Sequence, residues 1–311
     1  TIWYYRTMKV VVYTASANDM RFQIPIQLMG NAAYKDGHEV KVVQGQEYED
    51  CDLAIIWGSW KDRDTPWHNI KRKVVKKAPQ FIVLETPILN RGPVKDIMDD
   101  QWYRIGLNGF LAHMGDFKND YSNDDRWKLF QQMGYELKPE RETNKFKPIV
   151  IVLQLPGDAS LCGHDISEWC IRTVRSIRSV TDRKIIIRKP QVEREYRIAE
   201  ALDLFDNVDI QEGKHENVKS TIQAAHALVT FSSGMGVEAL IEGTPVIAHH
   251  QASFVYDITP NKIEDIENIK LPDRKQWIND MAYTTWSLEE IGKGLPWKHL
   301  TKVELRSIRG H

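Results

Sequence analysis

One stretch of the sequence, residues 227–249, constrains the fold more than any other part of the chain. It reads ALVTFSSGMGVEALIEGTPVIAH, in which a short apolar run leads into a turn of small residues and then into a helical pattern. Gly243 and Pro245 end that helix, and Val246 to Ala248 starts another strand. This order predicts two parallel strands joined by a helix. The helix start also predicts an anion site, because its first N–H groups lack helical partners.

The turn and the helix that follows it carry polar groups suited to a nucleotide. Ser232 and Ser233 offer hydroxyl donors, and Gly234 and Gly236 let a phosphate approach the backbone closely. Glu238 lies one turn inside the helix, where its carboxylate can accept both hydroxyls of a ribose whose phosphates rest on the turn. The alternative interpretation is an ordinary crossover whose small residues only permit close packing.

This stretch resembles the donor-nucleotide segment of GT-B glycosyltransferases, in particular the capsule-polysaccharide group of Kdo-transferase-like enzymes. The matching residues are Ser232, Ser233, Gly236, Glu238, Gly243, Pro245 and Val246. The likeness covers roughly residues 149–257, and related-looking chains occur in bacteriophages. The resemblance implies an α/β fold with two Rossmann-like domains, whose parallel sheets face each other across a cleft.

Strand and helix patterns alternate through both halves of the 311-residue chain, which is long enough for two α/β domains. The predicted strands are residues 9–13, 40–43, 53–57, 81–84, 149–155, 184–188 and 208–210, and the predicted helices are 25–33, 67–77, 166–180, 192–204 and 216–226. Residues 138–148, KPERETNKFKP, have the composition of a linker. We therefore predict an acceptor-binding domain over residues 1–145 and a nucleotide-sugar-binding domain over 146–311, whose last helix can pack back on the first domain.

Basic residues and a histidine extend the predicted donor site. Arg188 and Lys189 end the strand pattern IIIRKP and would supply positive charge to the departing diphosphate. The capsule-type enzymes carry a basic-Pro-His-Pro element near this position, whereas this chain reads Arg-Lys-Pro-Gln and lacks that histidine. By the resemblance, His249 lies where sugar or base contacts occur. A solvated strand end and a structural histidine are the respective alternatives.

Glycosyl transfer also needs a base that deprotonates the acceptor hydroxyl, and we expect it in the first half of the chain. Glu85 ends the apolar pattern FIVLE and ranks above Asp19, in the loop after the first strand, and Asp116, in GFLAHMGDF. Asp-x-Asp patterns at residues 50–52 and 62–64 fall at a strand start and in a loop, so we discount them as metal motifs. The prediction is an enzyme that needs no metal and no cofactor besides its donor substrate.

The net charge and composition of the chain limit the kinds of partner that it is expected to bind. The formal net charge is −1, so binding to DNA would have to rest on a local patch. The densest basic run comprises Lys71, Arg72, Lys73, Lys76 and Lys77, which we interpret as solvated helix surface. Three cysteines without metal or disulfide spacing, together with the lack of a membrane-length apolar run or a signal-peptide pattern, predict a cytoplasmic protein.

The leading interpretation is a metal-independent glycosyltransferase that moves a sugar from a nucleotide sugar, favoured as a UDP-sugar, to an acceptor hydroxyl. We favour a 5-hydroxymethylpyrimidine in phage DNA as the acceptor, with a saccharide or lipid-linked glycan as the alternative. Two different functions also fit the pattern: a nucleotide-sugar 2-epimerase, which needs no acceptor, and a non-catalytic nucleotide- or DNA-binding module.

Overall fold

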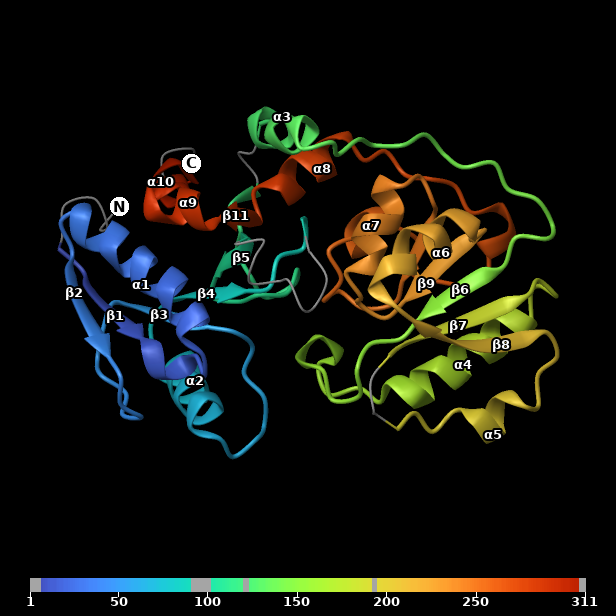
Figure 1. Ribbon diagram of the computed structural model, residues 1–311, viewed down its shortest axis with the longest axis horizontal. Helices are drawn as coiled ribbons and strands as arrows, with labels where there is room; N and C mark the ends of the chain where they lie inside the picture. Colours follow the sequence, from blue (N-terminus) through green and yellow to red (C-terminus); the bar gives the residue numbers. More distant parts are fainter. Residues whose placement is uncertain (1–6, 91–101, 120–122, 192–194, 308–311) are drawn as a thin grey trace. The chain divides into compact units, whose positions relative to one another are not determined.

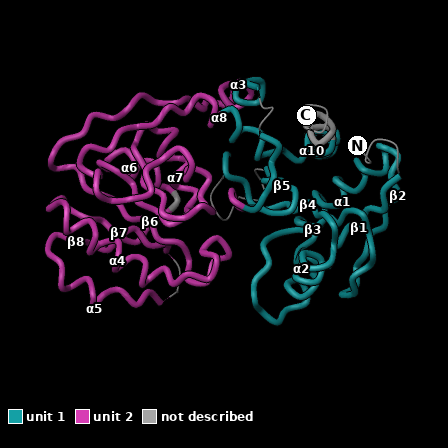
Figure 2. Tube along the Cα trace, turned by 180° about the vertical axis from the view of Figure 1, so that it is seen from behind, with its two compact units in different colours: residues 1–110, 114–127, 279–311 teal, residues 111–113, 128–278 magenta. Residues whose placement is uncertain are grey.

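The chain forms two compact units, each built on one β-sheet. The computed structural model describes residues 7–90, 102–119, 123–191 and 195–307 (Figure 1). Unit 1 comprises residues 1–110, 114–127 and 279–311, and unit 2 comprises residues 111–113 and 128–278 (Figure 2). The predicted fold class, α/β with two Rossmann-like domains, is confirmed.

The sheet of unit 1 has the strand order β11-β5-β4-β3-β1-β2. Its strands are β1 (Lys9–Tyr13), β2 (Glu39–Val43), β3 (Leu53–Trp57), β4 (Phe81–Glu85), β5 (Trp102–Leu107) and β11 (Thr285–Ser287). The first four strands are parallel, and β5 runs antiparallel to both β4 and β11. The sequence predicted only parallel strands here. It missed β5 because Arg104 and Gly106 interrupt the apolar run in WYRIGL.

Helices α1 (Met20–Lys35) and α2 (Pro66–Lys77) follow β1 and β3. The helix predicted from Pro25 begins at Met20 instead, because the Asp19 side chain accepts the Arg21 N–H and caps the first turn. The end of the chain returns to this unit as α9 (Leu288–Gly292) and α10 (Leu295–Ser307), which pack against α1. Trp297 anchors this return by donating from Nε1 to Asp36 at 3.0 Å.

All five strands of unit 2 are parallel, in the order β10-β9-β6-β7-β8. They are β6 (Ile149–Val152), β7 (Ile185–Pro190), β8 (Val208–Gly213), β9 (Ala227–Thr230) and β10 (Val246–Ala248). Along the chain, the connections run outward to one side from β6 and then to the other side from β9. Ligands of open α/β sheets bind at such a reversal, outside the carboxyl ends of the strands. We therefore expect a ligand site at the loops that follow β6 and β9.

Helices cover both faces of this sheet, with α4 (Ile166–Arg178) and α5 (Ala199–Leu202) on one side and α6 (Val218–Ala224) and α7 (Met235–Ile241) on the other (Figure 1). The helix predicted over residues 192–204 is reduced to the single turn of α5, and residues 192–194 lie outside the described part. Tertiary contacts hold the preceding residues, since the Tyr196 hydroxyl donates to the Gln154 carbonyl and the Arg197 N–H donates to Ser167 Oγ.

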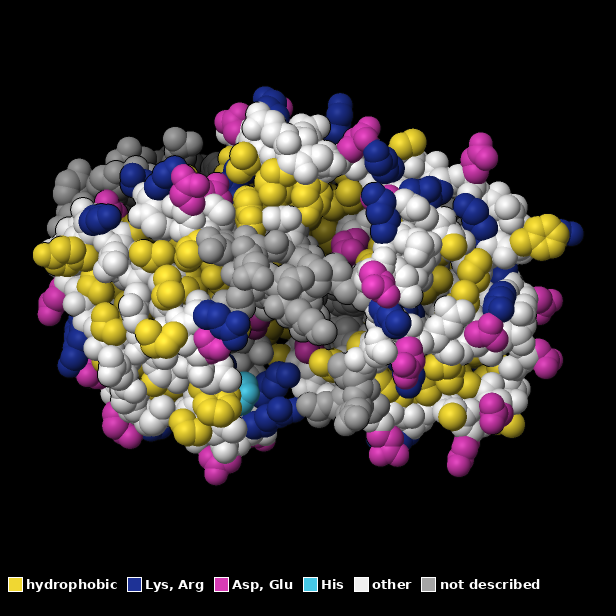
Figure 3. All heavy atoms as spheres, viewed as in Figure 1, with side chains coloured by type: hydrophobic (Ala, Val, Ile, Leu, Met, Phe, Trp, Pro, Cys, Tyr) yellow, Lys and Arg dark blue, Asp and Glu magenta, His cyan; other side chains and the backbone are white. Residues whose placement is uncertain are grey.

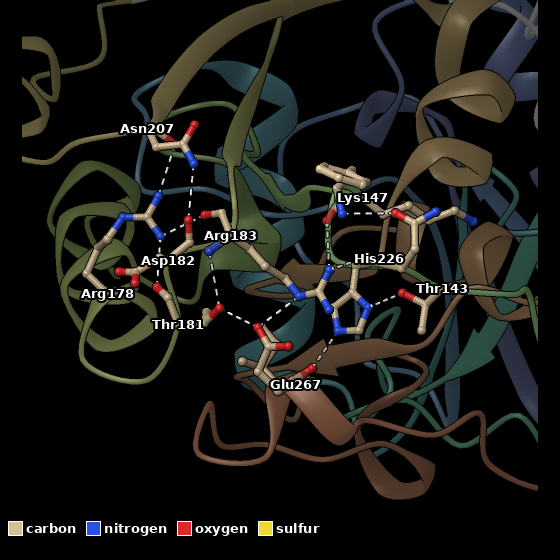
Figure 4. Close-up of polar contacts among 12 residues, drawn as sticks. Thr143, Lys147, Arg178, Thr181, Asp182, Arg183, Asn207, His226 and Glu267 are labelled. Carbon is tan, nitrogen blue, oxygen red and sulfur yellow. Dashed lines mark hydrogen bonds and ion pairs between the residues drawn. The ribbon is translucent and has the colours of Figure 1, made fainter.

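The segment predicted as a linker is bound to unit 2. Its backbone pairs with the end of α7, where the Lys138 N–H donates to the Ile241 carbonyl and Arg141 forms an ion pair with Glu242 at 3.1 Å. At the amino edge of the sheet, Figure 4 shows Thr143 against the His226 ring. These contacts explain why the units divide at residue 127, before the boundary predicted at 145.

Apolar side chains from the sheet and its helices fill the core of each unit. In unit 1, β1, β3 and β4 pack against α1, and the indole of Trp297 lies in the same cluster. In unit 2, β6, β7 and β9 pack against α4 and against Ile263, Ile266 and Ile269 of a later segment. None of the helices in the described ranges is both long and apolar enough to cross a membrane.

Candidate functional site

The loops after β6 and β9 meet at the reversal of unit 2, and Gln154 connects them. Its Nε2 donates to Ser160 Oγ at 2.5 Å and to Ser232 Oγ at 2.9 Å, while its Oε1 accepts the Ser232 N–H at 3.1 Å. The Ser232 hydroxyl donates to the Ser160 carbonyl at 2.7 Å, and Ser232 is only 9% exposed. Both donors of Ser232 are therefore used to order the turn. Sequence reasoning missed Gln154 because it placed this residue inside a strand over residues 149–155, whereas β6 ends at Val152 and Gln154 lies in the loop that follows.

The rest of the turn also uses many of its donors internally. The Ser233 N–H donates to Thr230 Oγ1 at 2.9 Å, the Met235 N–H to Ser233 Oγ at 3.3 Å and the Gly236 N–H to the Ser233 carbonyl at 3.0 Å. Within the described ranges, the Gly234 N–H and the Ser233 hydroxyl hydrogen have no acceptor. The turn therefore offers fewer donors to an anion than the sequence predicted.

The two glycines of the turn meet different surroundings. A Cβ on Gly236 would lie 3.2 Å from Val255 Cγ2, so this glycine lets α7 pack closely on the following segment. A Cβ on Gly234 would meet nothing within 4 Å, so the space beside the turn is open at this position. The packing alternative therefore applies to Gly236, and access for a ligand applies to Gly234.

Arg188, near the end of β7, is a buried cation whose guanidinium does not use all of its donors within the described residues. It is 8% exposed, and its Nη2 donates to the Lys214 carbonyl at 2.6 Å and to Asn217 Oδ1 at 3.4 Å. Its buried Nε has no hydrogen-bond partner in the described part of the chain. The guanidinium packs on Gly213, where a Cβ would stand 2.6 Å from Nε. Burial lowers the pKa of Arg188, and the negative charge of Glu238 opposes this shift.

The remaining charges of this edge lie on Lys189 and Glu238. Lys189 is half-buried, and its Nζ forms an ion pair with Glu212 Oε1 at 3.3 Å. Glu238 is half-buried in the first turn of α7 and close enough to Arg188 to influence its charge. The structure thus places Arg188 and Glu238, from two separate stretches of sequence, near enough for the Glu238 charge to act on Arg188, and their roles at a donor site stay a prediction.

His249 borders a cavity of about 550 Å³ that runs along α4 past the ends of β9 and β10. The Trp169 indole donates to His249 Nδ1 at 3.0 Å, so the ring hydrogen is on Nε2. Burial lowers the pKa of His249 to about 4, and the charge of Glu264 opposes this shift. His249 is therefore a neutral Nε2–H donor at neutral pH.

His250 belongs to an aromatic cluster in the same part of unit 2. Its ring stacks on Phe231 with centroids 4.7 Å apart, and His164 meets it edge-on at 5.5 Å. Burial lowers the pKa of His250, and the neighbouring His164 and His113 add to this effect. Across the ranges that the structure describes, no three His, Cys, Asp or Glu side chains are arranged to hold a metal ion. Metal independence stays a prediction.

The three candidate bases of unit 1 differ in what already surrounds them. Asp19 caps α1 and pairs with Arg21 at 2.7 Å, and its hydrogen bonds to the Arg21 side chain and backbone lower its pKa to about 2. Asp116 forms an ion pair with Lys118 and also accepts the Lys118 N–H. Both carboxylates are therefore already paired with a cation.

Glu85 is held by backbone groups at the carboxyl end of β4. Its Oε2 accepts the Ser59 N–H at 2.9 Å, and its Oε1 accepts the Thr86 N–H at 2.8 Å. These bonds fix the orientation of the carboxylate and leave further lone pairs on both oxygens. Glu85 keeps its first rank among the candidate bases.

Only part of the basic run on α2 is the solvated surface that the sequence predicted, since Lys76 and Lys77 are exposed but the other three residues are not. Lys71 is 4% exposed and lies on the buried side of the helix with Ile70 and Val74. Arg72 donates to the Lys61 and Arg63 carbonyls, Lys73 donates to the Gln46 carbonyl, and the Lys77 ammonium lies 5.3 Å from the centre of the Tyr48 ring. The available signal was the position of Lys71 beside the two apolar residues at helical spacing.

Comparisons with known proteins support the fold. No protein-family model and no curated protein matches the chain. A Thermosulfurimonas dismutans KpsC structure described as a beta Kdo 2,4 transferase aligns with a TM-score of 0.56 and 13% identity, over 94% of this chain and 99% of that chain. A second structure from that organism, a KpsC beta Kdo 2,7 transferase, aligns with a TM-score of 0.52 and 15% identity, over 93% of this chain and 98% of that chain.

A UDP-GlcNAc 2-epimerase from Methanocaldococcus jannaschii aligns with a TM-score of only 0.31 and 12% identity, over 86% of this chain and 96% of that chain. That score is too low to support a shared fold. The two Kdo transferases show that the chain has a GT-B fold like theirs, as the resemblance implied. The likeness to bacteriophage chains stays a prediction.

Proposed function

We propose that the chain is a glycosyltransferase that moves a sugar from a nucleotide sugar, a UDP-sugar in this proposal, to an acceptor hydroxyl. The fold shared with the two Kdo transferases supports a transferase architecture. The observation that carries the proposal is the buried guanidinium of Arg188 with its unpartnered Nε. Removing a guanidinium from water is unfavourable unless an anion or enough acceptors replace the water. The diphosphate of the donor would complete this site.

Each predicted donor-site residue of unit 2 has a role in this proposal. Arg188 binds the diphosphate, with the Gly234 N–H and the Ser233 hydroxyl as neutral donors. Glu238 accepts the ribose hydroxyls, and the His249 Nε2–H donates to the sugar. Ser232 positions the turn, Gly236 allows α7 to pack, and Lys189 adds positive charge at the strand end while paired with Glu212.

Arg188 and Glu85 also act in the glycosyl-transfer step of this proposal. When the bond between the sugar and the diphosphate breaks, negative charge grows on the departing phosphate oxygen. A charge-assisted hydrogen bond from Arg188 stabilises that charge more strongly than a neutral donor does. Glu85 takes the proton of the acceptor hydroxyl as its oxygen attacks the sugar. Neither step uses a metal in this proposal.

The acceptor has two candidates. A 5-hydroxymethylpyrimidine in DNA would need a basic surface for its phosphates, but the burial of Lys71 and the contacts of Arg72 and Lys73 leave only Lys76 and Lys77 of the basic run on α2 exposed. Figure 3 shows one face of the protein, on which Lys and Arg side chains are interspersed with Asp and Glu. On this face the mixed charges do not form the concentrated positive surface that phosphate-dominated binding needs, so we favour a saccharide or lipid-linked glycan over DNA.

The test is incubation with a panel of UDP-sugars and either hydroxymethylated DNA or glycans, followed by mass spectrometry of the acceptor. The proposal expects one added glycosyl unit on one acceptor class. A parallel incubation with the donor alone addresses the epimerase, since epimerised sugar without acceptor would contradict transfer. Tight nucleotide binding without any product would instead support a non-catalytic module.

A further inference from the structure

Lys71 of unit 1 has surroundings that its structural position does not explain. Its side chain is almost fully buried, and it forms no hydrogen bond or ion pair with any residue that the structure describes. Ile70 and Val74 occupy the same buried side of α2. A buried ammonium without a partner is unfavourable for folding. A methionine of similar length would fit this side of the helix without that penalty.

The Lys71 ammonium and the Glu85 carboxylate border one small space beside Gly58. A Cβ on Gly58 would lie 3.5 Å from Lys71 Nζ and 3.9 Å from Glu85 Oε2. Gly58 has a φ of 74°, a conformation that favours glycine, so the space stays open. The two charged groups form no ion pair with each other. Their separation leaves room for a small polar group that contacts both.

This space lies where the topology of unit 1 predicts a ligand. Strand β1 is followed by β2 on one side and β3 on the other, so the strand order reverses between β1 and β3. Gly58 and Ser59 directly follow β3, and Glu85 ends β4 beside it. Ligands of open α/β sheets bind outside the carboxyl ends of strands near such a reversal.

We propose that this space receives the acceptor hydroxyl and that Lys71 is a catalytic residue together with Glu85. This inference rests on the proposed function. A hydroxyl is the group that fits both neighbours, because it donates its hydrogen to the carboxylate and accepts a hydrogen bond from the ammonium. An isolated anion would meet Glu85 as a like charge at the same space.

The step balances as a glycosyl transfer. The acceptor O–H bond breaks and its proton passes to Glu85, while the oxygen electron pair forms the new bond to the sugar. The bond between the sugar and the diphosphate breaks, and its electron pair stays on the phosphate oxygen. Lys71 keeps its protons throughout. Its hydrogen bond favours the partly deprotonated hydroxyl because the ammonium is positive.

Lys71 must be protonated for this role, which predicts a pH dependence. Burial lowers the pKa of Lys71 to about 8; the Glu85 charge opposes this shift and the Lys61 charge adds to it. His68, on the same helix, has a pKa lowered to about 4 by burial and by nearby cations, so it is neutral in this range. The transfer rate should therefore fall as the pH rises above about 8.

The experiment compares Lys71→Met with Lys76→Met, which removes an exposed lysine from the same helix. The assay uses the donor and acceptor pair that the panel identifies. For Lys71→Met we expect kcat to fall about 100-fold, as for loss of one acid–base or electrostatic catalytic group, with the donor KM unchanged. We also expect the fall in rate above about pH 8 to disappear. Lys76→Met should keep both the rate and the pH profile.

The outcomes separate this inference from the proposed function. Unchanged kcat and an unchanged alkaline limb in Lys71→Met, with active wild type, would overturn the inference alone. No transfer by wild type with any acceptor would overturn both. Thermal unfolding checks the variant, because removing an unpaired buried charge should leave its Tm at or above that of wild type. Glu85→Gln provides a second check, since it should lose rate and move the alkaline limb to lower pH, because the Glu85 charge raises the pKa of Lys71.

Discussion

The contact between Arg188 and Gly213 gives a prediction that reaches the donor site without changing a polar residue. In Gly213→Ala, the new methyl group would lie 2.6 Å from Arg188 Nε and must displace the guanidinium. The φ of Gly213 does not lie in the left-handed region, so the backbone itself tolerates alanine. Displacement should weaken the bonds to the Lys214 carbonyl and Asn217 and move Nε away from the proposed diphosphate site.

The expected loss follows from the bond that is removed. A hydrogen bond to a charged group is worth about 1.5–3 kcal/mol, which corresponds to an increase of about 10- to 150-fold in the Kd for the nucleotide. Isothermal titration with UDP at fixed salt measures this change. Gly45→Ala is the matched control, because a Cβ at Gly45 meets nothing within 4 Å and its φ is also outside the left-handed region.

A double-mutant cycle tests whether Gly213→Ala acts through Arg188. If Gly213→Ala acts through Arg188, adding it to Arg188→Gln should cause little further loss of affinity. Additive losses, or wild-type affinity in Gly213→Ala, would refute the proposed route. Arg175→Gln, on the exposed side of α4, controls for the general loss of a positive charge.

Further predictions concern the turn, the ribose and the response to acid. Ser232→Ala should lower the free energy of unfolding by about 1–3 kcal/mol, because it leaves buried polar partners unsatisfied. Ser233→Ala should mainly weaken donor binding. Chemical denaturation and nucleotide titration of both variants separate the two effects. Glu238→Ala should weaken binding of UDP by about tenfold or more while binding of inorganic diphosphate changes little, and full UDP affinity would exclude the ribose contact. Burial lowers the pKa of His226, so the unfolded chain binds a proton at this residue more readily than the folded chain does. The contribution of neutral His226 to the free energy of unfolding should therefore be complete above about pH 6.5, the pKa in the unfolded chain, and should decline below it. A Tm that is constant from about pH 7.5 to about pH 5 in wild type would contradict the last expectation.

Sequence patterns predicted the strands of the core with little error because their signal is local. The strand patterns at residues 9–13, 53–57 and 227–230 match β1, β3 and β9, each a short apolar run that is buried on both faces of a parallel sheet. Antiparallel β5 contains no such apolar run. Strand β11 pairs with β5, which lies about 180 residues earlier in the sequence. Pairing over that distance leaves no local pattern to read.

The candidate site shows the same division between local and tertiary signals. The turn after β9 was visible as small residues between a strand and a helix, but the use of its donors by Gln154 depends on the loop that follows the neighbouring strand β6. Lys71 looked like one of five similar basic residues, and only the packing of α2 distinguishes it. The linker composition predicted a boundary at residue 145, whereas the compact units divide after residue 127, and composition does not reveal that Arg141 binds Glu242.

The proposed function depends most on the binding of the nucleotide-sugar diphosphate by Arg188 of unit 2. Its most direct test is to titrate wild type and Arg188→Gln with UDP and with UMP at the same ionic strength. We predict that wild type binds UDP at least about tenfold more tightly than UMP and that the variant loses most of this preference. Equal preference for UDP in wild type and Arg188→Gln would contradict the claim, as would failure of wild type to distinguish the two nucleotides.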